Sequence, residues 1–422
     1  MQPGVGKNAG SLAQCRMYEQ SELSGSWEKT EPHWNVYHRS DSETILTFRL
    51  KHRQEHQTTK QAHSSVSFHS IPDYIKKMKG NLIIICVSLA ANFQYGNAVE
   101  KFKLSSGHEI PAVGLGTSWI KLTEMDEAIA NALELGYRHI DTAFQYLNEA
   151  AIGAALKKWF QKGGKREDLF ITSKLPTHGN RAESVEKYLK QSLKDLDLDY
   201  VDMYLIHKPF GFKEGENMTE AKENGKIIFE NVDHLAVWKK MEEQVTAGRV
   251  KSIGLSNFNQ TQILNIYNNA EIKPSNLQVE WHAFLQQREL LEFCKKYNIV
   301  MTAYSPLGSP VWRGKFHNGT DKSLPRLTDL PEIKEIAKKY NKTAAQILLR
   351  HTVQAGLAVI PKSSNKDRQR ENIEIFDFSL SGEDVEKING LNKGEMGRVF
   401  DFVYYYEGID KNPQYPFATR AV

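Results

Sequence analysis

Four ionisable side chains lie at the ends of three short apolar runs in the middle of this chain. Asp141 and Tyr146 lie at and just beyond the end of the first run, Lys174 ends the second, and His207 ends the third. Each run has the length and composition of a β-strand. In a parallel α/β barrel, catalytic groups lie at the carboxyl ends of the strands. The spacing therefore predicts that these four side chains meet at one end of a barrel.

These four residue types could together transfer a proton to a carbonyl oxygen. The phenol of Tyr146 would be a poor donor by itself, because an unperturbed phenol has a pKa near ~10. An ammonium at Lys174 favours the phenolate and lowers that pKa, and a carboxylate at Asp141 keeps a buried ammonium charged. An imidazole at His207 could hydrogen-bond the substrate carbonyl and orient it toward the phenol. Any one of these residues alone is more often an ordinary rim residue, but four at successive strand ends are not expected by chance.

Eight short apolar segments alternate with amphipathic stretches between residue 99 and the C-terminus. The expected strands are 113–116, 139–141, 169–174, 201–207, 252–256, 276–280, 300–305 and 358–361. The expected helices are 124–134, 149–160, 182–195, 232–246, 260–269, 289–297 and 331–340. This alternation predicts an α/β fold, which is either a closed (β/α)8 TIM barrel or a doubly wound open sheet.

The first strand–helix turn favours the barrel. An open dinucleotide-binding sheet has the pattern G-x-G-x-x-G at this turn, whereas this chain has Gly-Leu-Gly followed by Trp119 in place of the third glycine. We therefore predict a (β/α)8 barrel with an N-terminal β-hairpin near residues 101–109 that caps its amino end. The insertion 210–229 and the aromatic-rich tail 394–422 should be long loops over the carboxyl end, where barrel loops shape the substrate site.

The composition argues against several classes of protein. With 40% apolar and 25% charged residues, the chain is an ordinary globular protein with a large core. Its net charge of +4 is small for 422 residues, and no basic cluster with interleaved aromatic residues indicates a nucleic-acid partner. Cys15, Cys86 and Cys294 have no paired spacing. Neither a disulfide framework nor a metal site is therefore indicated.

Residues 1–98 differ in composition from the segment that follows. Residues 1–77 are polar and lack apolar periodicity, so we expect a disordered extension. Residues 78–98 combine an apolar run at 82–91, preceded by lysines, with small residues at 96–98, which resembles a secretory signal peptide. The run is too short to span a bilayer. The alternatives are a buried strand or helix packed on the barrel, or an anchor that is not cleaved.

The position of the signal-like segment affects where the protein is expected. Signal peptides lie at the start of a chain, so the simplest account is that Met78 is the working initiator and residues 1–77 are an extension. The protein would then enter the secretory pathway or the extracellular space and begin near Val99. With initiation at Met1, we expect a cytoplasmic protein.

From residue 99 to residue 398 the chain resembles the aldo-keto reductase family. The resemblance rests on Gly136-Tyr-Arg-His-Ile-Asp-Thr-Ala with Tyr146 and Asn148-Glu149, on Ile171-Thr-Ser-Lys-Leu, and on Asp199-Tyr-Val-Asp-Met-Tyr-Leu-Ile-His. It continues through Ile253-Gly-Leu-Ser-Asn-Phe-Asn, Thr302-Ala-Tyr-Ser-Pro-Leu-Gly-Ser and Val359-Ile-Pro-Lys-Ser. These motifs are specific, and they point to the aldose reductase-like or carbonyl reductase branch of the family.

The resemblance implies an NADP-dependent enzyme that reduces an aldehyde or a ketone with NADPH. It implies that Tyr146 protonates the carbonyl oxygen and that Lys174, Asp141 and His207 support this step. For the nicotinamide it implies Ser256, Asn257 and Gln278 at the carboxamide and Tyr304 against the ring. Along the pyrophosphate it implies Ser305, Leu307 and Ser309. At the 2′-phosphate it implies Lys362, Ser363, Asn365 and Arg368, and at the adenine Glu371 and Asn372.

The basic segment around Lys362 and Arg368 has two interpretations. A 2′-phosphate needs cations, and Arg can bind it in bidentate fashion. Without the resemblance, a solvated basic loop would be the simpler interpretation of the same residues.

Three positions depart from the family pattern. Pro176 and Lys208 stand where relatives often have tryptophan or another aromatic residue, and Ser118-Trp119 shifts a tryptophan by one position. These positions normally wall the substrate pocket, so the departures leave the substrate class open but not the reductive chemistry. Because it has a signal-like segment, the chain resembles secreted insect-type members of the family that reduce steroid ketones.

We therefore expect a single-barrel enzyme, an aldehyde or ketone reductase that acts as a monomer on a small carbonyl substrate. The first alternative is a steroid 3-ketone reductase. The second is a nucleotide-binding scaffold protein with little turnover, which the four intact candidate catalytic residues argue against.

Overall fold

The computed structural model describes residues 99–310 and 324–417, together with the backbone of five short strands between residues 17 and 66. The chain divides into two units, Met1–Tyr95 and Gly96–Val422. In the first unit two antiparallel sheets form, from β1 (Met17–Glu19) with β2 (Glu28–Thr30), and from β3 (His33–Ser40), β4 (Glu43–Arg49) and β5 (His63–Val66).

These strands differ from the disorder expected for residues 1–77. β3 and β4 contain aromatic and β-branched residues that favour strands, and the polar composition of the whole segment hides that local signal. The remaining residues before 99, including the whole signal-like segment 78–98, lie outside the described residues. The predicted domain boundaries there stay predictions.

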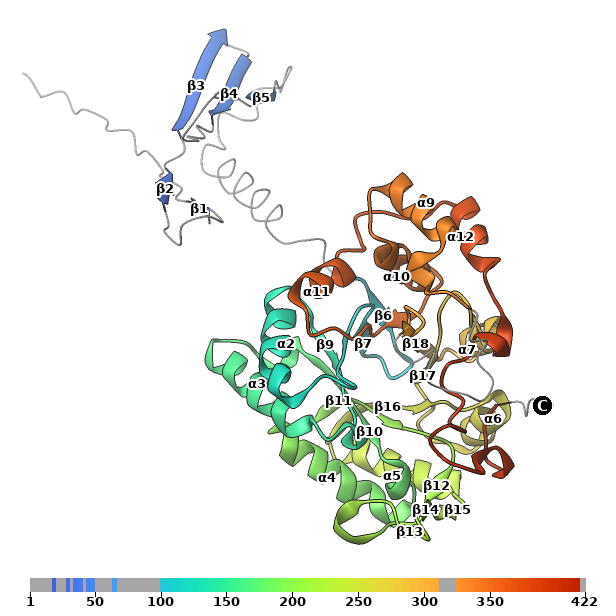
Figure 1. Ribbon diagram of the computed structural model, residues 1–422. Coiled ribbons are helices and arrows are strands. Elements are labelled where there is room, and N and C mark those ends of the chain that lie inside the picture. Colours follow the sequence, from blue (N-terminus) through green and yellow to red (C-terminus); the bar gives the residue numbers. More distant parts are fainter. Residues whose placement is uncertain are drawn as a thin grey trace, which may run out of the picture. The chain divides into compact units, whose positions relative to one another are not determined.

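The second unit is a barrel of eight parallel strands (Figure 1). The strands are β8 (Leu115–Gly116), β9 (His139–Asp141), β10 (Phe170–Leu175), β11 (Val201–Ile206), β16 (Val250–Ser256), β17 (Asn276–Glu280), β18 (Val300–Tyr304) and β19 (Ala358–Val359). Each strand pairs with the next, and the first and last strands also meet: Val359 N donates to Ala112 O at 2.8 Å, and Gly114 N donates to Val359 O at 2.8 Å. The sheet is therefore closed and has no free edge, as the sequence predicts.

Helices surround the barrel, and most of them bury apolar residues on one face. They are α2 (Leu122–Glu134), α3 (Glu149–Gln161), α4 (Val185–Leu196), α5 (His234–Thr246), α6 (Gln260–Asn269), α7 (Arg288–Lys296), α9 (Pro331–Tyr340), α10 (Ala344–Gln354), α11 (Lys366–Ile373) and α12 (Gly382–Asn389). In α2 the buried residues follow three- and four-residue spacing, namely Met125, Ala128, Ile129, Ala132 and Leu133. The last three helices have no counterpart in the sequence-based expectation. Within the described ranges, no helix has the length and hydropathy needed to cross a membrane.

A short hairpin closes the amino end of the barrel. It consists of β6 (Lys101–Lys103) and β7 (Glu109–Pro111), which pair antiparallel. The hairpin contributes Leu104 and Ile110 to a cluster with side chains from three barrel strands, namely Phe170, Met203, Leu205 and Ala358. The predicted hairpin cap is confirmed.

The insertion after β11 and the C-terminal tail cover the opposite end. The insertion forms two small ribbons, from β12 (Gly211–Phe212) with β15 (Phe229–Glu230), and from β13 (Lys222–Glu223) with β14 (Lys226–Ile227). Insertion and tail share an apolar cluster, here called the mouth cluster, that contains Phe210, Phe212, Phe402, Tyr406 and Ile409. Glu280, the last residue of β17, accepts hydrogen bonds from the backbone of Val399 at 2.8 Å and Phe400 at 2.9 Å. Both loops therefore lie over the carboxyl end, as predicted.

Candidate active site

A buried lysine joins two of the predicted catalytic residues. Lys174 Nζ donates to Asp141 Oδ1 at 2.6 Å, to Thr142 O at 2.7 Å and to Tyr146 Oη at 3.4 Å. The side chains of Lys174 and Asp141 are 0% and 2% exposed. Strand register explains the meeting, because Asp141 on β9 lies beside Thr172 on β10, and Lys174 follows two residues later on the same face.

The other oxygen of Asp141 is bound from across the barrel. Gln278 Nε2, on β17, donates to Asp141 Oδ2 at 2.7 Å. Gln278 was predicted at the nicotinamide carboxamide, and here it also belongs to the polar cluster of the catalytic residues. With both its oxygens accepting hydrogen bonds, the buried carboxylate of Asp141 is fixed in position.

The loop that carries Tyr146 is held by a second polar residue. Tyr146 ends the 3-10 turn η2 (Phe144–Tyr146), and Asn148 follows two residues later. Thr142 Oγ1 donates to Asn148 Oδ1 at 3.0 Å, and Asn148 Nδ2 donates to Thr117 O at 3.0 Å. The ring of His207 lies edge-on to the ring of Tyr146 with 5.7 Å between centroids. The structure therefore brings all four predicted catalytic residues together.

The charges of this cluster favour a protonated phenol beside an ammonium. Burial would lower the pKa of Lys174, but Asp141 and Tyr146 outweigh it and the pKa is raised. Burial raises the pKa of Tyr146, and Lys174 opposes that rise without cancelling it. The sequence-based expectation of a lowered tyrosine pKa is thus wrong for the free protein, because burial has the larger effect. A phenol that keeps its proton can act as a proton donor.

The imidazole of His207 is neutral in this setting. Burial moves its pKa well below the ordinary range, and the charges of Lys208 and Lys174 act in the same direction. Within residues 99–310 and 324–417, neither ring nitrogen of His207 has a hydrogen-bond partner, and Nδ1 is buried. A neutral imidazole can donate one hydrogen bond without bringing a second cation to the site.

The residues predicted at the nicotinamide follow the next strands around the barrel. Ser256 ends β16, and Asn257 follows it with a positive φ of 65°. Asn257 Nδ2 donates to Ser256 Oγ at 3.0 Å, and Tyr304 Oη donates to Asn257 Oδ1 at 2.9 Å. Asn257 Nδ2 also donates to His207 O at 3.0 Å, which links this group to the strand of the imidazole.

The residues predicted at the pyrophosphate and adenosine follow β18 and β19. Ser309 Oγ donates to Ser305 Oγ at 2.7 Å, and Leu307 packs against the core. Asn365 is the N-cap of α11, and its Oδ1 accepts from Arg368 N at 2.9 Å. Ser363 and Asn372 are buried, whereas Glu371 is partly exposed. Within the described residues, no hydrogen bond or ion pair joins Glu371 or Asn372 to the nicotinamide group.

Two cations in this last segment differ from their neighbours in their contacts. Lys362 and Arg368 are exposed, and neither forms an ion pair within the described part of the chain. Their neighbours do: Lys366 pairs with Glu134 at 2.9 Å and Arg370 with Asp367 at 3.0 Å. These two cations are those predicted at the 2′-phosphate, and the charge of Lys362 also helps to lower the pKa of Glu124.

Sequence reasoning assigned no separate role to Glu149, the first residue of α3. Its side chain is buried, and it accepts hydrogen bonds from Ser173 Oγ at 2.6 Å and Ser192 Oγ at 2.8 Å. Ser173 precedes Lys174, so the carboxyl ties the Tyr146 loop to the strand of the lysine. An acidic residue in the first turn of a helix ordinarily lies at the surface and interacts favourably with the helix dipole. The sequence alone therefore does not indicate that the Glu149 side chain points inward.

Replacement of Glu149 by glutamine should remove a pH dependence of stability. Burial raises the pKa of Glu149 from 4.5 to about 7. The folded state therefore binds this proton more tightly than the unfolded state, and the resulting stabilisation is full below pH 4.5 and is lost as pH rises through 7. Between pH 5 and 8, the free energy of unfolding of the wild type should fall by on the order of 2 kcal/mol relative to that of Glu149→Gln. Urea unfolding at several pH values measures this difference. Parallel pH curves for the two proteins would contradict this result.

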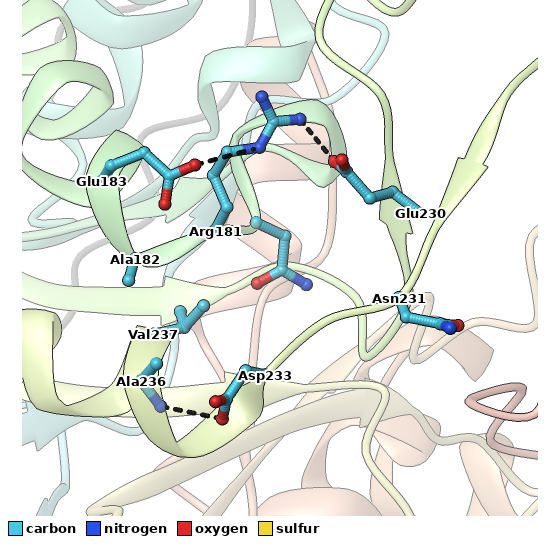
Figure 2. A pocket seen from close by; sticks show the side chains of 9 residues that line it. Arg181, Ala182, Glu183, Glu230, Asn231, Asp233, Ala236 and Val237 are labelled. Carbon is cyan, nitrogen blue, oxygen red and sulfur yellow. Dashed lines mark hydrogen bonds and ion pairs between the residues drawn. The ribbon is translucent and has the colours of Figure 1, made fainter.

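A pocket beside the insertion is separate from the cluster. Figure 2 shows Arg181 between Glu183 and Glu230, with Asp233 capping α5 nearby. Arg181 Nη2 lies 2.7 Å from Glu230 Oε2, and Arg181 Nη1 lies 3.4 Å from Glu214 Oε2. None of the four candidate catalytic residues lines this pocket. Its ion pairs attach the insertion to the barrel.

Fold and site together define a (β/α)8 barrel enzyme with an acid–base cluster at the carboxyl ends of its strands. Comparison with known proteins shows to which family of barrel enzymes the chain is similar. Residues 112–393 match the model of the Aldo/keto reductase family. The chain is 44% identical over 300 residues to aldo-keto reductase family 1 member A1 of Xenopus tropicalis, covering 70% of this chain and 90% of that protein.

Further relatives agree. Prostaglandin F synthase 1 of Bos taurus is 41% identical over 327 residues, which cover 76% of this chain and 98% of that protein. The solved aldose reductase of Schistosoma japonicum matches with a TM-score of 0.68 at 40% identity, covering 76% of this chain and all of that one. The chain belongs to the aldo-keto reductase family. The expected barrel fold and the expected NADP-dependent oxidoreductase are confirmed, and such enzymes generally reduce carbonyl groups with NADPH.

Proposed function

We propose that this protein reduces an aldehyde or a ketone to an alcohol with NADPH, and that Tyr146 donates the proton. The observation that carries the proposal is the buried chain of contacts from Asp141 through Lys174 to the phenol, at 2.6 Å and 3.4 Å. This series of contacts places the positive charge of Lys174 beside the protonated hydroxyl group of Tyr146. That is the arrangement a general acid needs if it must release its proton to a substrate oxygen.

Each residue of the cluster has a distinct part in this proposal. His207 donates a hydrogen bond to the carbonyl oxygen and orients it toward the phenol. Tyr146 gives its proton to the same oxygen, and Lys174 stabilises the phenolate that remains. Asp141 keeps Lys174 charged despite its burial, and Gln278 holds Asp141 in place.

The cofactor segment supports the choice of NADPH. When bound, NADPH supplies the hydride. Ser256, Asn257 and Tyr304 would hold its nicotinamide end, and Lys362 and Arg368 would bind the 2′-phosphate. The support for this assignment is that both cations are exposed and that neither forms an ion pair within residues 99–310 and 324–417.

The direct test follows NADPH consumption optically with a panel of carbonyl compounds. The panel includes aliphatic and aromatic aldehydes, simple ketones and a 3-keto steroid. Reduction of any of them with a matching yield of alcohol supports the proposal, and selective use of the steroid would favour the steroid reductase alternative. NADPH binding without reduction of any compound would favour the scaffold alternative and overturn the proposal.

Replacement of Arg368 by methionine should weaken NADPH binding and spare NADH binding. NADH has no 2′-phosphate, and losing one charge-assisted hydrogen bond of about 1.5 to 3 kcal/mol corresponds to roughly ten- to a hundredfold in affinity. Fluorescence titration of both cofactors measures the effect. Arg370→Met is the matched control, because Arg370 lies on the same helix but pairs with Asp367.

Two outcomes of this titration would contradict the cofactor assignment. Equal weakening of NADPH and NADH would mean that Arg368 supports the fold or the adenine. Tighter binding of NADH than of NADPH by the wild type would mean that the segment does not recognise the 2′-phosphate.

We also propose that a protein translated from Met78 is exported. Lysines, an apolar run and small residues follow one another between 76 and 98 as in a signal peptide. Expressed from Met78 in eukaryotic cells, the protein should leave the cytosol and begin near Val99, which N-terminal mass spectrometry measures. An intact Met78 terminus in the cytosol would contradict export.

A further inference from the structure

Lys208 is a buried cation at the carboxyl end of β11, directly after His207. The residue is 9% exposed. Its backbone oxygen accepts from Asn180 Nδ2 at 3.0 Å, and the same amide nitrogen donates to Phe210 O at 3.2 Å. The loop that carries the lysine is therefore fixed where the strand meets the insertion.

The contacts of the ammonium group are a phenol and two aromatic rings. Lys208 Nζ donates to Tyr406 Oη at 2.7 Å. It lies 4.8 Å from the centroid of the Tyr406 ring and 5.5 Å from that of Phe402. All of these contacts come from the mouth cluster, and ring faces attract a cation more weakly than a carboxylate does.

Other buried cations of the described residues have carboxylate partners. Lys174 pairs with Asp141 at 2.6 Å, Arg350 pairs with Glu100 at 3.0 Å, and Arg398 pairs with Glu395 at 2.7 Å. Within residues 99–310 and 324–417, Lys208 forms no such pair. Burying a charge without a counter-charge is unfavourable. An anion that bound to Lys208 would therefore be stabilised by this unpaired charge.

Lys208 lies at the strand end that carries the candidate reaction centre. Lys208 follows His207 in the chain, and the His207 ring packs edge-on against the Tyr146 ring at 5.7 Å. The charge of Lys208 is one of the causes, after burial, that lower the pKa of His207.

We propose that Lys208 determines substrate specificity by binding a carboxylate of the substrate, so that the enzyme prefers aldehydes or ketones that carry a carboxylate group. The inference rests on the proposed function, because it places the substrate carbonyl at Tyr146. The competing interpretation is that Lys208 only tethers the tail through Tyr406. The two interpretations differ in one measurable quantity, the preference for charged over neutral substrates.

The experiment compares two aldehydes that differ only in charge, 4-carboxybenzaldehyde and its methyl ester. The wild type should reduce the acid with a kcat/KM at least about tenfold above that of the ester, since a charge-assisted hydrogen bond is worth roughly tenfold or more. Rising salt should diminish the preference. In Lys208→Met the preference should fall to about one, chiefly through a higher KM for the acid.

Two further variants separate recognition from tethering. Lys208→Arg keeps the charge and should keep a preference for the acid. Lys226→Met removes an exposed lysine that also joins the insertion to the tail, through Glu407 at 2.8 Å, and should leave the preference unchanged. A wild-type preference near one, or an equal loss for acid and ester in Lys208→Met, would overturn the inference. Failure of the wild type to reduce either aldehyde, or any compound of the carbonyl panel, would instead contradict the proposed function.

Discussion

Replacement of Tyr146 by phenylalanine should lower turnover by about a hundred- to ten-thousandfold and leave NADPH affinity within about twofold. General acid catalysis contributes roughly a hundred- to ten-thousandfold, and Tyr146 is the one hydroxyl that contacts the buried Lys174 within the described residues. The phenol contributes no charge to cofactor binding, so KM for NADPH should change little. Steady-state kinetics and cofactor titration on the same preparation measure both quantities.

The control for this variant is the stability of the protein. Phenylalanine keeps the ring that packs against His207, so the urea midpoint should stay close to that of the wild type. Turnover above about a tenth of the wild-type value, in a protein that unfolds normally, would show that another group supplies the proton. Loss of NADPH binding would show that the residue supports the cofactor site instead.

The barrel could be predicted because each of its strands can be recognised from its local sequence. Each expected strand lies within a few residues of an observed one, since a parallel strand that is covered on both faces is a short apolar run between turns. The catalytic cluster could be predicted for the same reason. Polar residues at the carboxyl ends of neighbouring parallel strands meet at one mouth, and Asp141 and Lys174 do so.

Other features could not be predicted because they depend on distances between remote segments. α11 was missed because it is almost entirely polar and starts from an N-cap rather than an apolar pattern. The pKa of Tyr146 reflects a balance between burial and Lys174 that no spacing reveals. The partner of Lys208 is Tyr406, which lies 198 residues later, and the sequence showed only that a lysine stands at an aromatic position.

The buried ion pair at the centre of the site allows a test of function and stability together. Lys174→Met removes the ammonium and leaves the carboxylate of Asp141 buried, with Gln278 as its remaining donor. Breaking a buried pair from one side typically costs about 3 to 5 kcal/mol. Turnover should also fall by about a hundredfold or more, because the phenol loses the charge that stabilises its deprotonated form.

The double variant Lys174→Met with Asp141→Asn separates these two effects. Removing both charges leaves no uncompensated carboxylate in the barrel, so much of the lost free energy of unfolding should return. Turnover should not return, because neither methionine nor asparagine can stabilise a phenolate at Tyr146. A double variant that regains both stability and activity would show that the ion pair matters for packing alone. One that regains neither would show that Asp141 has a structural role beyond balancing the charge of Lys174, such as fixing Gln278 on the opposite side of the barrel.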